Sequence, residues 1–336
     1  MLDLQEERRI AEVSSPVEPD AIGRWRFKDL LDTDVLRRDD IELVMETSEA
    51  MREVRSRPAG KIATLRGTIV ATLFYEQSTR TRASFEVAGK SLGADVVNLS
   101  ATGSSVEKGE SLIDTVRTLE QIGADIIVMR HKSSGAPYLA ARHSSASIIN
   151  GGDGTHAHPT QALLDLFTMR RHLGSLEGRK VAIVGDVIHS RVARSNIYTL
   201  LASGAHVVLC GPAALLPRTL ATSLSEFGRC EVTTDCDSAL RDADVVMALR
   251  IQKERQTAGF IPSFRDYIRG YQVNERRLAL ARPKALLMHP GPRNEGIEVS
   301  ASVTMGTQSV IEEQVANGVA VRMALLYLTV TGRAAV

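Results

Sequence analysis

The sequence has few of the features that mark several common classes of protein. Its 336 residues include only three cysteines, Cys210, Cys230 and Cys236, and no two of them form a CxxC pair. A sparse, odd set of cysteines predicts a reducing compartment without a disulfide framework. The 41 basic and 40 acidic residues nearly cancel. Because a balanced chain has no strong surface field, we expect no nucleic-acid partner.

Signals for membranes and for export are also missing. No apolar run comes near the ~20 residues that a membrane span requires, so we expect no membrane association. Residues 1–20 are charged and lack the apolar middle of a signal peptide. Residues 1–22 contain two prolines and little apolar periodicity, which predicts a loosely ordered extension. The predicted setting is cytoplasmic.

Two nucleotide-binding motifs are absent. Residues 184–191 contain one glycine where the dinucleotide motif GxGxxG needs three, and Asp186 stands where a pyrophosphate would approach. Gly60-Lys61 is followed by Ile62 and lacks the upstream glycine of the phosphate-binding motif GxxxxGK[ST]. Nicotinamide and ATP binding are therefore disfavoured.

A histidine pair raises the question of a metal. His156 and His158 could chelate from alternate positions, but Asp153 is the only other candidate ligand nearby, and neither HExxH nor a cysteine set accompanies them. We expect no metal and no cofactor. His158 precedes Pro159 and a predicted helix, which suits a neutral imidazole that donates a hydrogen bond to a reacting carbonyl. A purely structural histidine is the alternative.

Strands and helices alternate in two runs along the chain. In the first run, apolar stretches predict strands at 68–75, 95–99, 124–129 and near 148–149, with helices at 39–55, from 83, at 111–121 and at 160–173. In the second run, strands at 180–184, 206–210, 231–233, 244–249 and 286–288 accompany helices at 192–202 and 215–227. This pattern predicts an α/β fold with two doubly wound parallel-sheet domains joined by long helices, and an active site in the cleft between them.

The domain limits follow from the same pattern. We expect a first domain at 23–158, a second at 159–307, and a terminal helix in 308–336 that packs back on the first domain. That helix should turn Val315, Val319, Met323 and Leu326 to one face. Residues 252–270 are charged and interrupted by glycine and proline, which predicts a long surface loop.

The segment Ser78-Thr79-Arg80-Thr81-Arg82 lies between a predicted strand and a predicted helix. A helix N-terminus presents free N–H groups and the positive end of the helix dipole. Three hydroxyls and two guanidiniums add directed donors that suit phosphate oxygens. The segment therefore predicts an anion site. A Ser/Thr helix cap flanked by solvated arginines is the alternative.

Further cationic and polar residues follow other predicted strands. With Arg80 they are Arg130, His158, Arg191, Arg250 and Arg293. Carboxyl ends of parallel strands are where ligands bind in such sheets. Six such groups in two facing domains predict a cleft for a ligand with several anionic groups.

Seven segments, in order, resemble the aspartate/ornithine carbamoyltransferase family, and its aspartate-specific catalytic chains in particular. They are Phe74–Glu86 (FYEQSTRTRASFE), Ser104–Glu110 (SSVEKGE), Arg130-His131, His158–Thr168 (HPTQALLDLFT), Gly185–Asn196 (GDVIHSRVARSN), Leu249–Arg255 (LRIQKER) and His289–Glu298 (HPGPRNEGIE). The resemblance covers about residues 27–330. It implies transfer of the carbamoyl group from carbamoyl phosphate to L-aspartate, an early step of pyrimidine synthesis.

The resemblance also implies roles for individual residues. Carbamoyl phosphate would be bound by Ser78, Thr79, Arg80, Thr81, Arg130, His158, Gln161, backbone at Gly291 and Pro292, and by Ser104 and Lys108 of a neighbouring subunit. Among these, Arg80, Thr81, Arg130 and His158 would be catalytic. Aspartate would be bound by Lys108, Arg191, Arg250 and Gln252. Glu76 would pair with Arg191 and Arg255 on domain closure. Shared residues imply a homotrimer, and whether a regulatory or dihydroorotase-like chain joins it stays open.

Several positions bear on the choice of substrate. Ornithine-specific relatives carry His-Cys-Leu-Pro where this chain has residues 289–292 without cysteine, and Arg250 supplies a cation for a second carboxylate. Glu107, Gly291 and Glu295 depart from the commonest family pattern. The Gly291–Pro292 bond is expected to be cis. A carbamoyltransferase for another amino acid and a catalytically silent relative are the alternatives.

Overall fold

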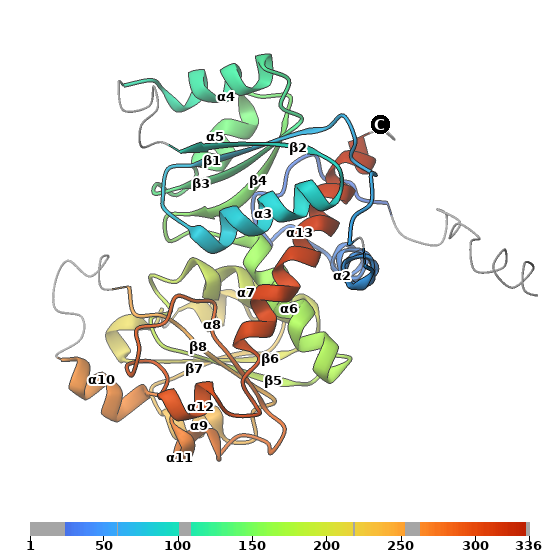
Figure 1. Ribbon diagram of the computed structural model, residues 1–336. Helices are drawn as coiled ribbons and strands as arrows, with labels where there is room; N and C mark the ends of the chain where they lie inside the picture. Colours follow the sequence, from blue (N-terminus) through green and yellow to red (C-terminus); the bar gives the residue numbers. More distant parts are fainter. Residues whose placement is uncertain (1–23, 59, 101–108, 218, 253–262, 334–336) are drawn as a thin grey trace, which may run out of the picture.

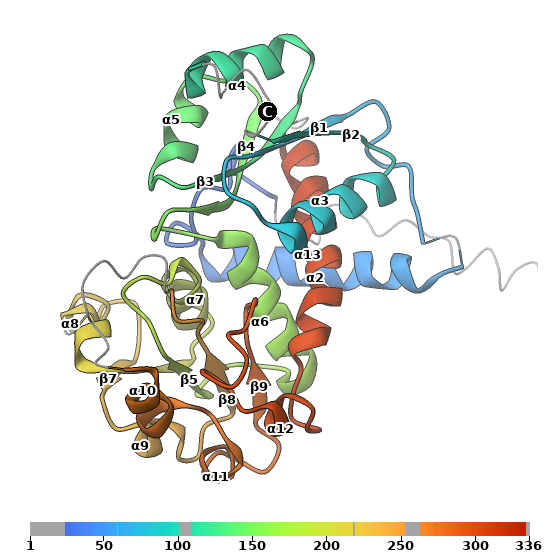
Figure 2. The same cartoon turned by 60° about the vertical axis from the view of Figure 1, so that its left-hand side comes forward.

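Two separate parallel β-sheets organise the molecule (Figure 1). The structure, a computed structural model, describes residues 24–58, 60–100, 109–217, 219–252 and 263–333. Each sheet carries helices, and long helices run between the two sheets (Figure 2). The predicted fold class is confirmed. The expected extension at 1–22 lies outside the described residues.

The first sheet has four strands in the order β2-β1-β3-β4. They are β1 (Ile69–Phe74), β2 (Asp95–Ser100), β3 (Ile126–His131) and β4 (Ser147–Asp153), and all three pairings are parallel. β1, β3 and β4 are almost entirely buried. Sheets covered on both faces need such continuous apolar runs, which is why these strands were visible in the sequence.

The second sheet has five strands in the order β7-β6-β5-β8-β9, again all parallel. They are β5 (Lys180–Val184), β6 (His206–Cys210), β7 (Cys230–Thr233), β8 (Val245–Ala248) and β9 (Leu286–Met288). The described helices, in chain order, are α2 (Arg38–Ser56), α3 (Thr79–Ser91), α4 (Leu112–Gln121), α5 (Ala136–Arg142), α6 (Pro159–Leu173), α7 (Arg191–Ala202), α8 (Leu220–Ser223), α9 (Cys236–Leu240), α10 (Phe264–Tyr271), α11 (Glu275–Leu278), α12 (Ala301–Thr304) and α13 (Ile311–Arg333).

Each sheet reverses its winding at one point. In the first sheet the reversal lies between β1 and β3, and in the second between β5 and β8. Adjacent loops leave such a point in opposite directions and open a crevice at the carboxyl ends of the strands. The segment after β1, the end of β3, the turn after β5 and the end of β8 carry Arg80, Arg130, Arg191 and Arg250. Topology therefore explains why cations far apart in sequence meet.

Helix α13 crosses from the second sheet to the first and packs against α2, α3 and α6. From the sequence we expected no apolar run long enough to span a membrane. By length and composition, α13 could cross one. The share of its most apolar window buried inside the protein is 67%. Burial of that kind is expected of a core helix.

The inward face of α13 differs from the prediction. Met323 and Leu326 are buried, but Val315 is 52% exposed. Gln314 and Asn317 point inward instead, where their amides donate to Asp165 and Thr168 of α6. Hydrogen bonding to α6, rather than apolar periodicity, sets the orientation of the first turns.

Two further expectations were wrong. The described residues of 215–227 do not form one helix, and among them only α8 is helical, apart from a 3₁₀ turn that ends at Leu215. Pro217 lies in this stretch, and a proline lacks the N–H that a helix interior requires. Within the expected loop at 252–270, residues 253–262 lie outside the described residues, but Phe264 begins helix α10. Its N-cap Ser263 accepts the Asp266 amide, and Tyr267 is buried.

Candidate functional site

The predicted anion segment lies where β1 passes into α3. Ser78 is the N-cap, and its Oγ accepts the backbone N–H of Thr81 at 3.3 Å. The capping alternative is therefore observed. It does not account for the neighbours, because the side chains of Ser78, Thr79, Arg80 and Thr81 all line one cavity. Arg82 is exposed and is not among the lining residues.

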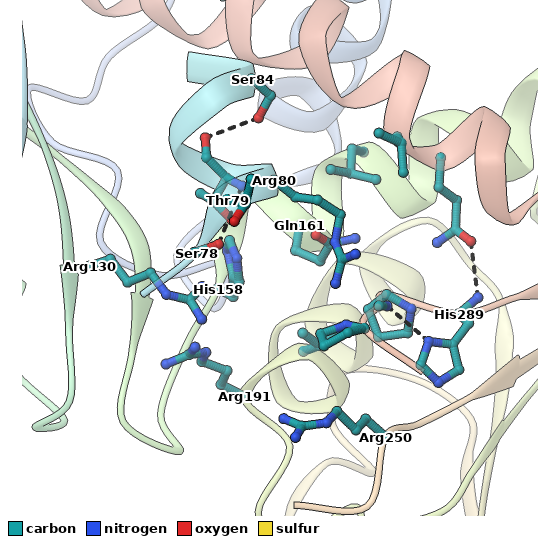
Figure 3. Close-up of a pocket in the computed structure, with 18 of the residues that line it drawn as sticks. Ser78, Thr79, Arg80, Ser84, Arg130, His158, Gln161, Arg191, Arg250 and His289 are labelled. Carbon is teal, nitrogen blue, oxygen red and sulfur yellow. Dashed lines mark hydrogen bonds between the residues drawn. The ribbon is translucent and has the colours of Figure 1, made fainter. Parts of the chain in front are cut away.

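That cavity, of about 870 Å³, lies between the two sheets (Figure 3). Among the described residues, seven cationic side chains and one carboxylate line it. They are Arg80, Arg130, Lys132, Arg191, Arg250, Arg293 and Arg322, with Glu76. Burial lowers the pKa of Arg80, and the nearby charge of Arg250 lowers it further. A space so rich in positive charge favours anionic ligands.

The cavity brings together most of the residues predicted for the site. Besides those named it is lined by His158, Gln161, Gln252, Gly291 and Pro292. Ser104, Lys108 and Arg255 lie outside the described residues.

Glu76 joins cations from both sheets. Its carboxylate accepts from Arg130 at 2.7 Å and from Arg191 at 2.7 and 3.0 Å. Arg130 is the penultimate residue of β3 in the first sheet, whereas Arg191 is the first residue of α7, which belongs with the second sheet. The expected pairing of Glu76 with Arg191 is present, and the bond to Arg130 was not foreseen.

The last residues of β4 and Gly154, which follows the strand, hold both of these arginines. Gly151 O accepts from Arg130 at 3.2 Å, and Gly154 O accepts from Arg191 at 3.1 Å. Gly152 lies between them with φ +115°, and a Cβ there would lie 3.0 Å from Arg191 Nε and 3.2 Å from Arg130 Nη1. Only glycine lets the two guanidiniums pass this close to the backbone.

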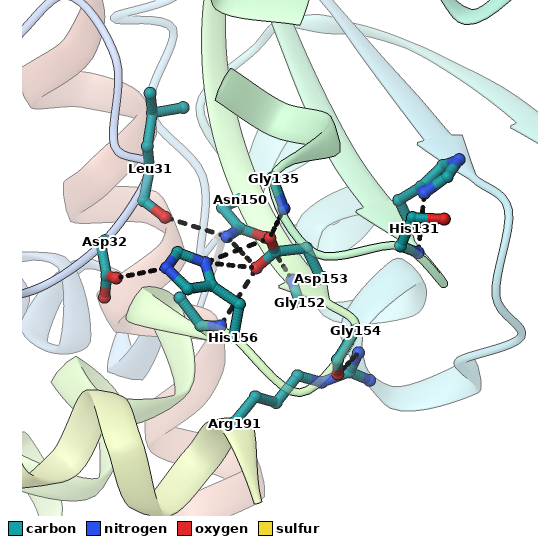
Figure 4. A network of polar contacts seen from close by, with 12 residues as sticks. Leu31, Asp32, His131, Gly135, Asn150, Gly152, Asp153, Gly154, His156 and Arg191 are labelled. Carbon is teal, nitrogen blue, oxygen red and sulfur yellow. Dashed lines mark hydrogen bonds and ion pairs between the residues drawn. The ribbon is translucent and has the colours of Figure 1, made fainter. Parts of the chain in front are cut away.

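Polar contacts also fix this end of β4 (Figure 4). Asp153 is fully buried and accepts from Asn150 Nδ2, from the Gly135 N–H and from the Ala157 N–H. The two ring nitrogens of His156 approach Asp153 at 3.2 Å and Asp32 at 3.3 Å. The hydrogen bond to Asp153 raises the pKa of His156. In the described parts of the chain, no three His, Cys, Asp or Glu side chains are grouped as metal ligands.

His158 follows this segment and is the residue before α6. Its backbone N–H donates to Ser195 Oγ at 2.9 Å, and its side chain is buried. Burial, assisted by Arg130, Arg191 and Arg322, holds the pKa of His158 well below its usual value. A neutral imidazole at the cavity wall can donate one hydrogen bond without adding charge.

The segment after β9 closes another side of the cavity. The Gly291–Pro292 bond is cis, as predicted. Gly291 has φ +65°, and a Cβ there would lie 2.9 Å from the guanidinium carbon of Arg80. A side chain at position 291 would therefore displace the Arg80 guanidinium, and the positive φ also favours glycine. His289 Nδ1 accepts the Gly291 N–H at 2.9 Å, and burial lowers the pKa of His289 to about 3.

Three buried polar residues in or next to the cavity wall were missed. Asp165 lies one turn after Gln161, a spacing that could have indicated contact on one helix face. Gln314 and Arg322 interrupt the apolar pattern of α13. Arg322 is 4% exposed, donates to Gly318 O at 3.1 Å and lies over the Phe85 ring. Burial lowers its pKa to about 10. The sequence could have indicated Arg322, because a charged side chain in an otherwise apolar helix is rarely buried without a partner or a function.

Comparison with known proteins bears on this site. Residues 28–171 match the family model described as aspartate/ornithine carbamoyltransferase, carbamoyl-P binding domain. Residues 177–329 match the corresponding Asp/Orn binding domain. A relative from Dehalococcoides mccartyi, named aspartate carbamoyltransferase catalytic subunit, is 56% identical over 90% of this chain and 92% of its own length.

Solved structures agree with the sequence matches. Aspartate transcarbamoylase from Trypanosoma cruzi, in complex with carbamoyl phosphate and aspartate, has a TM-score of 0.82 at 31% identity and covers 91% of this chain and 98% of its own. Ornithine carbamoyltransferase from Pyrococcus furiosus has a TM-score of 0.81 at 30% identity, with 91% and 97% covered. Both family models together span most of the chain, and the chain therefore belongs to the aspartate/ornithine carbamoyltransferase family.

Proposed function

We propose that the protein transfers the carbamoyl group of carbamoyl phosphate to the amino group of L-aspartate, giving N-carbamoyl-L-aspartate and phosphate. One observation carries the proposal. A single cavity contains the anion segment after β1 and, across from it, Arg191 and Arg250 of the second sheet. The names of the bacterial relatives and the ligands of the Trypanosoma cruzi structure support aspartate as the acceptor.

The first sheet and its helices would bind carbamoyl phosphate. Ser78, Thr79, Arg80 and Thr81 surround a helix N-terminus, where the dipole and free N–H groups favour a phosphate. Ser104 and Lys108 of a neighbouring subunit would complete this cradle. Gln161 and the backbone carbonyls near Pro292 would accept from the carbamoyl NH₂.

Catalysis would rest on charge stabilisation and orientation. The neutral amine of aspartate attacks the carbonyl carbon, and negative charge develops on the carbonyl oxygen. Arg130, His158 and Thr81 would donate to that oxygen. The C–O bond to phosphate then breaks, its electron pair leaves with the phosphate, and we propose that the phosphate accepts the amine proton. Holding two anions together can supply up to ~7–11 kcal/mol of the barrier reduction in favourable systems.

The second sheet would bind aspartate. Arg191 and Arg250 would each take one carboxylate, with Gln252 and Lys108 nearby. Arg191 is already bonded to Glu76 at 2.7 Å, so substrate binding would rearrange that ion pair. We infer that Arg255 then joins Glu76 as the domains close. Arg250, and the absence of cysteine from residues 289–292, favour aspartate over ornithine.

We further propose a cytoplasmic homotrimer with shared active sites that acts in pyrimidine (UMP) synthesis. Support comes from the resemblance of residues 104–110 to the segment that reaches a neighbouring subunit in this family. A regulatory or dihydroorotase-like chain is compatible with this assembly.

The decisive experiment is product formation from carbamoyl phosphate with aspartate, with ornithine in parallel and no added metal or nucleotide. Carbamoyl-aspartate alone is the expected product. Citrulline would move the activity to ornithine and overturn the role given to Arg250. A folded trimer that makes neither product would contradict catalysis by this chain on its own.

A further inference from the structure

A fully buried carboxylate, Asp165 of α6, lies beside the cavity floor and is not itself a lining residue. It accepts hydrogen bonds from amides on three different helices. Gln161 Nε2 of α6 donates at 2.9 Å, Gln314 Nε2 of α13 at 2.7 Å and Asn196 Nδ2 of α7 at 2.9 Å. Burial raises the pKa of Asp165 to about 6, although the three donors oppose the shift. Above that pH the group is an anion.

An ionised carboxylate can only accept hydrogen bonds, whereas a side-chain amide donates from one side and accepts on the other. Asp165 therefore determines which side of each amide faces it. For Gln314 the consequence is visible, because with Nε2 on Asp165 its Oε1 accepts the His289 N–H at 3.0 Å. For Gln161, which lines the cavity, the side left for a ligand is the carbonyl oxygen.

The amides of Gln161 and Gln314 both affect how the carbamoyl NH₂ of the ligand would be bound. A carbamoyl NH₂ only donates, so its binding site must consist of acceptors. Gln161 Oε1 is one acceptor. We expect the other acceptors to be backbone carbonyls near Gly291 and Pro292. Gln314 holds this segment, because it accepts the backbone N–H of His289. If the Gln161 amide were reversed, its NH₂ would face the ligand. If the Gln314 amide were reversed, its NH₂ would face the backbone N–H of His289.

We propose that Asp165 is a positioning residue that turns Gln161 and Gln314 so that the cavity selects a carbamoyl group over an acyl group of the same shape. This rests on the proposed function, because it concerns the carbamoyl end of the same ligand. Acetyl phosphate is the matched probe, since it replaces NH₂ by CH₃ and keeps the phosphate. Inorganic phosphate reports the anion segment alone.

The variant is Asp165→Leu, which is close in shape and removes both acceptor oxygens, because Gln161 and Gln314 share Oδ1 whereas Asn196 uses Oδ2 and could accept the NH₂ of an asparagine. Equilibrium titrations at pH 8 would give Kd for carbamoyl phosphate, acetyl phosphate and inorganic phosphate. We expect carbamoyl phosphate to bind about tenfold or more weakly, because a hydrogen bond is lost and a donor is left unpaired. Inorganic phosphate should stay within about twofold, since the anion segment does not contact Asp165.

Asn196→Ala is the control. Asn196 donates to the same carboxylate but does not line the cavity, so its loss should lower the melting temperature and keep the ligand ratio. A second test is Gln314→Met, which removes the acceptor of the His289 backbone N–H and leaves Asp165 in place. It should also weaken carbamoyl phosphate more than acetyl phosphate. In a protein that already carries Gln161→Met and Gln314→Met, Asp165→Leu should not change the ratio of the two affinities further.

The outcomes separate the inference from the proposed function. A folded Asp165→Leu protein with the wild-type ratio of carbamoyl to acetyl phosphate affinity would overturn the positioning role alone. If that variant does not fold, an unchanged ratio in Gln314→Met would overturn it. A wild-type protein with no preference for carbamoyl phosphate would refute the proposed function, and the positioning role with it.

Discussion

Replacing Gly152 by alanine should damage the site with little change elsewhere. Gly152 has φ +115°, and an added Cβ would lie 3.0 Å from Arg191 Nε, 3.1 Å from Arg191 Cζ and 3.2 Å from Arg130 Nη1. Contacts this short require the two guanidiniums to move by a few tenths of an ångström. Both are held by backbone carbonyls on either side of Gly152, so neither can move without straining a hydrogen bond.

Two costs follow from this geometry. A non-glycine residue in a sparsely populated backbone region costs of order 1–3 kcal/mol of folding stability. Displacement of the two arginines acts on the reaction itself. Because a misplacement of about 1 Å can cost about 100-fold in rate, a shift of a few tenths of an ångström should lower kcat/KM by about tenfold.

Gly174→Ala is the matched control. Gly174 also has a positive φ, of +69°, but a Cβ there meets nothing within 4 Å, and it caps α6 away from the cavity. Steady-state kinetics and thermal melting of both variants should show similar losses of stability, with loss of activity in Gly152→Ala alone. Wild-type kcat and KM in folded Gly152→Ala would refute the reasoning. Equal loss of activity in both variants would assign the effect to stability instead.

Three further predictions concern the phosphate, the subunits and pH. Arg80→Ala should raise KM for carbamoyl phosphate and lower kcat by at least about tenfold, because it removes a charge-assisted contact to phosphate; wild-type kinetics would contradict the cradle. Lys108→Ala and His158→Ala should each be nearly inactive, and mixed trimers should regain activity, since one site would combine both intact residues; confirmed mixed trimers without rescue would contradict shared sites. His289 has a folded pKa of about 3, below its unfolded value, so as pH falls below about 6.5 the unfolded state alone gains the proton and stability declines. When the pH falls from 7.5 to 5.5, the free energy of unfolding, measured with urea at fixed protein concentration, should decrease by about 1.4 kcal/mol less in His289→Asn than in wild type. Equal decreases would mean that His289 is protonated in the folded protein as well.

Features that depend on neighbours in sequence were predictable. Continuous apolar runs predicted the buried strands, and the strand–helix alternation predicted two parallel sheets with ligands at the strand ends. The anion segment at Ser78–Arg82 was also predictable, because a helix N-terminus after a strand has a known electrostatic character. Failures came where local pattern was weak, as at α10, where burial of Tyr267 outweighed an interrupted sequence.

The sequence by itself determined the fold class, the family and most of the cationic residues of the cavity. Tertiary structure alone decided which polar groups meet. His156 faces Asp32 and Asp153, Glu76 joins arginines of both sheets, and Asp165 binds amides from three helices. The physical reason is that periodicity and helix capping act over a few residues, whereas a buried polar group must find its partner wherever the packed chain brings one. Such partners leave no local pattern to read.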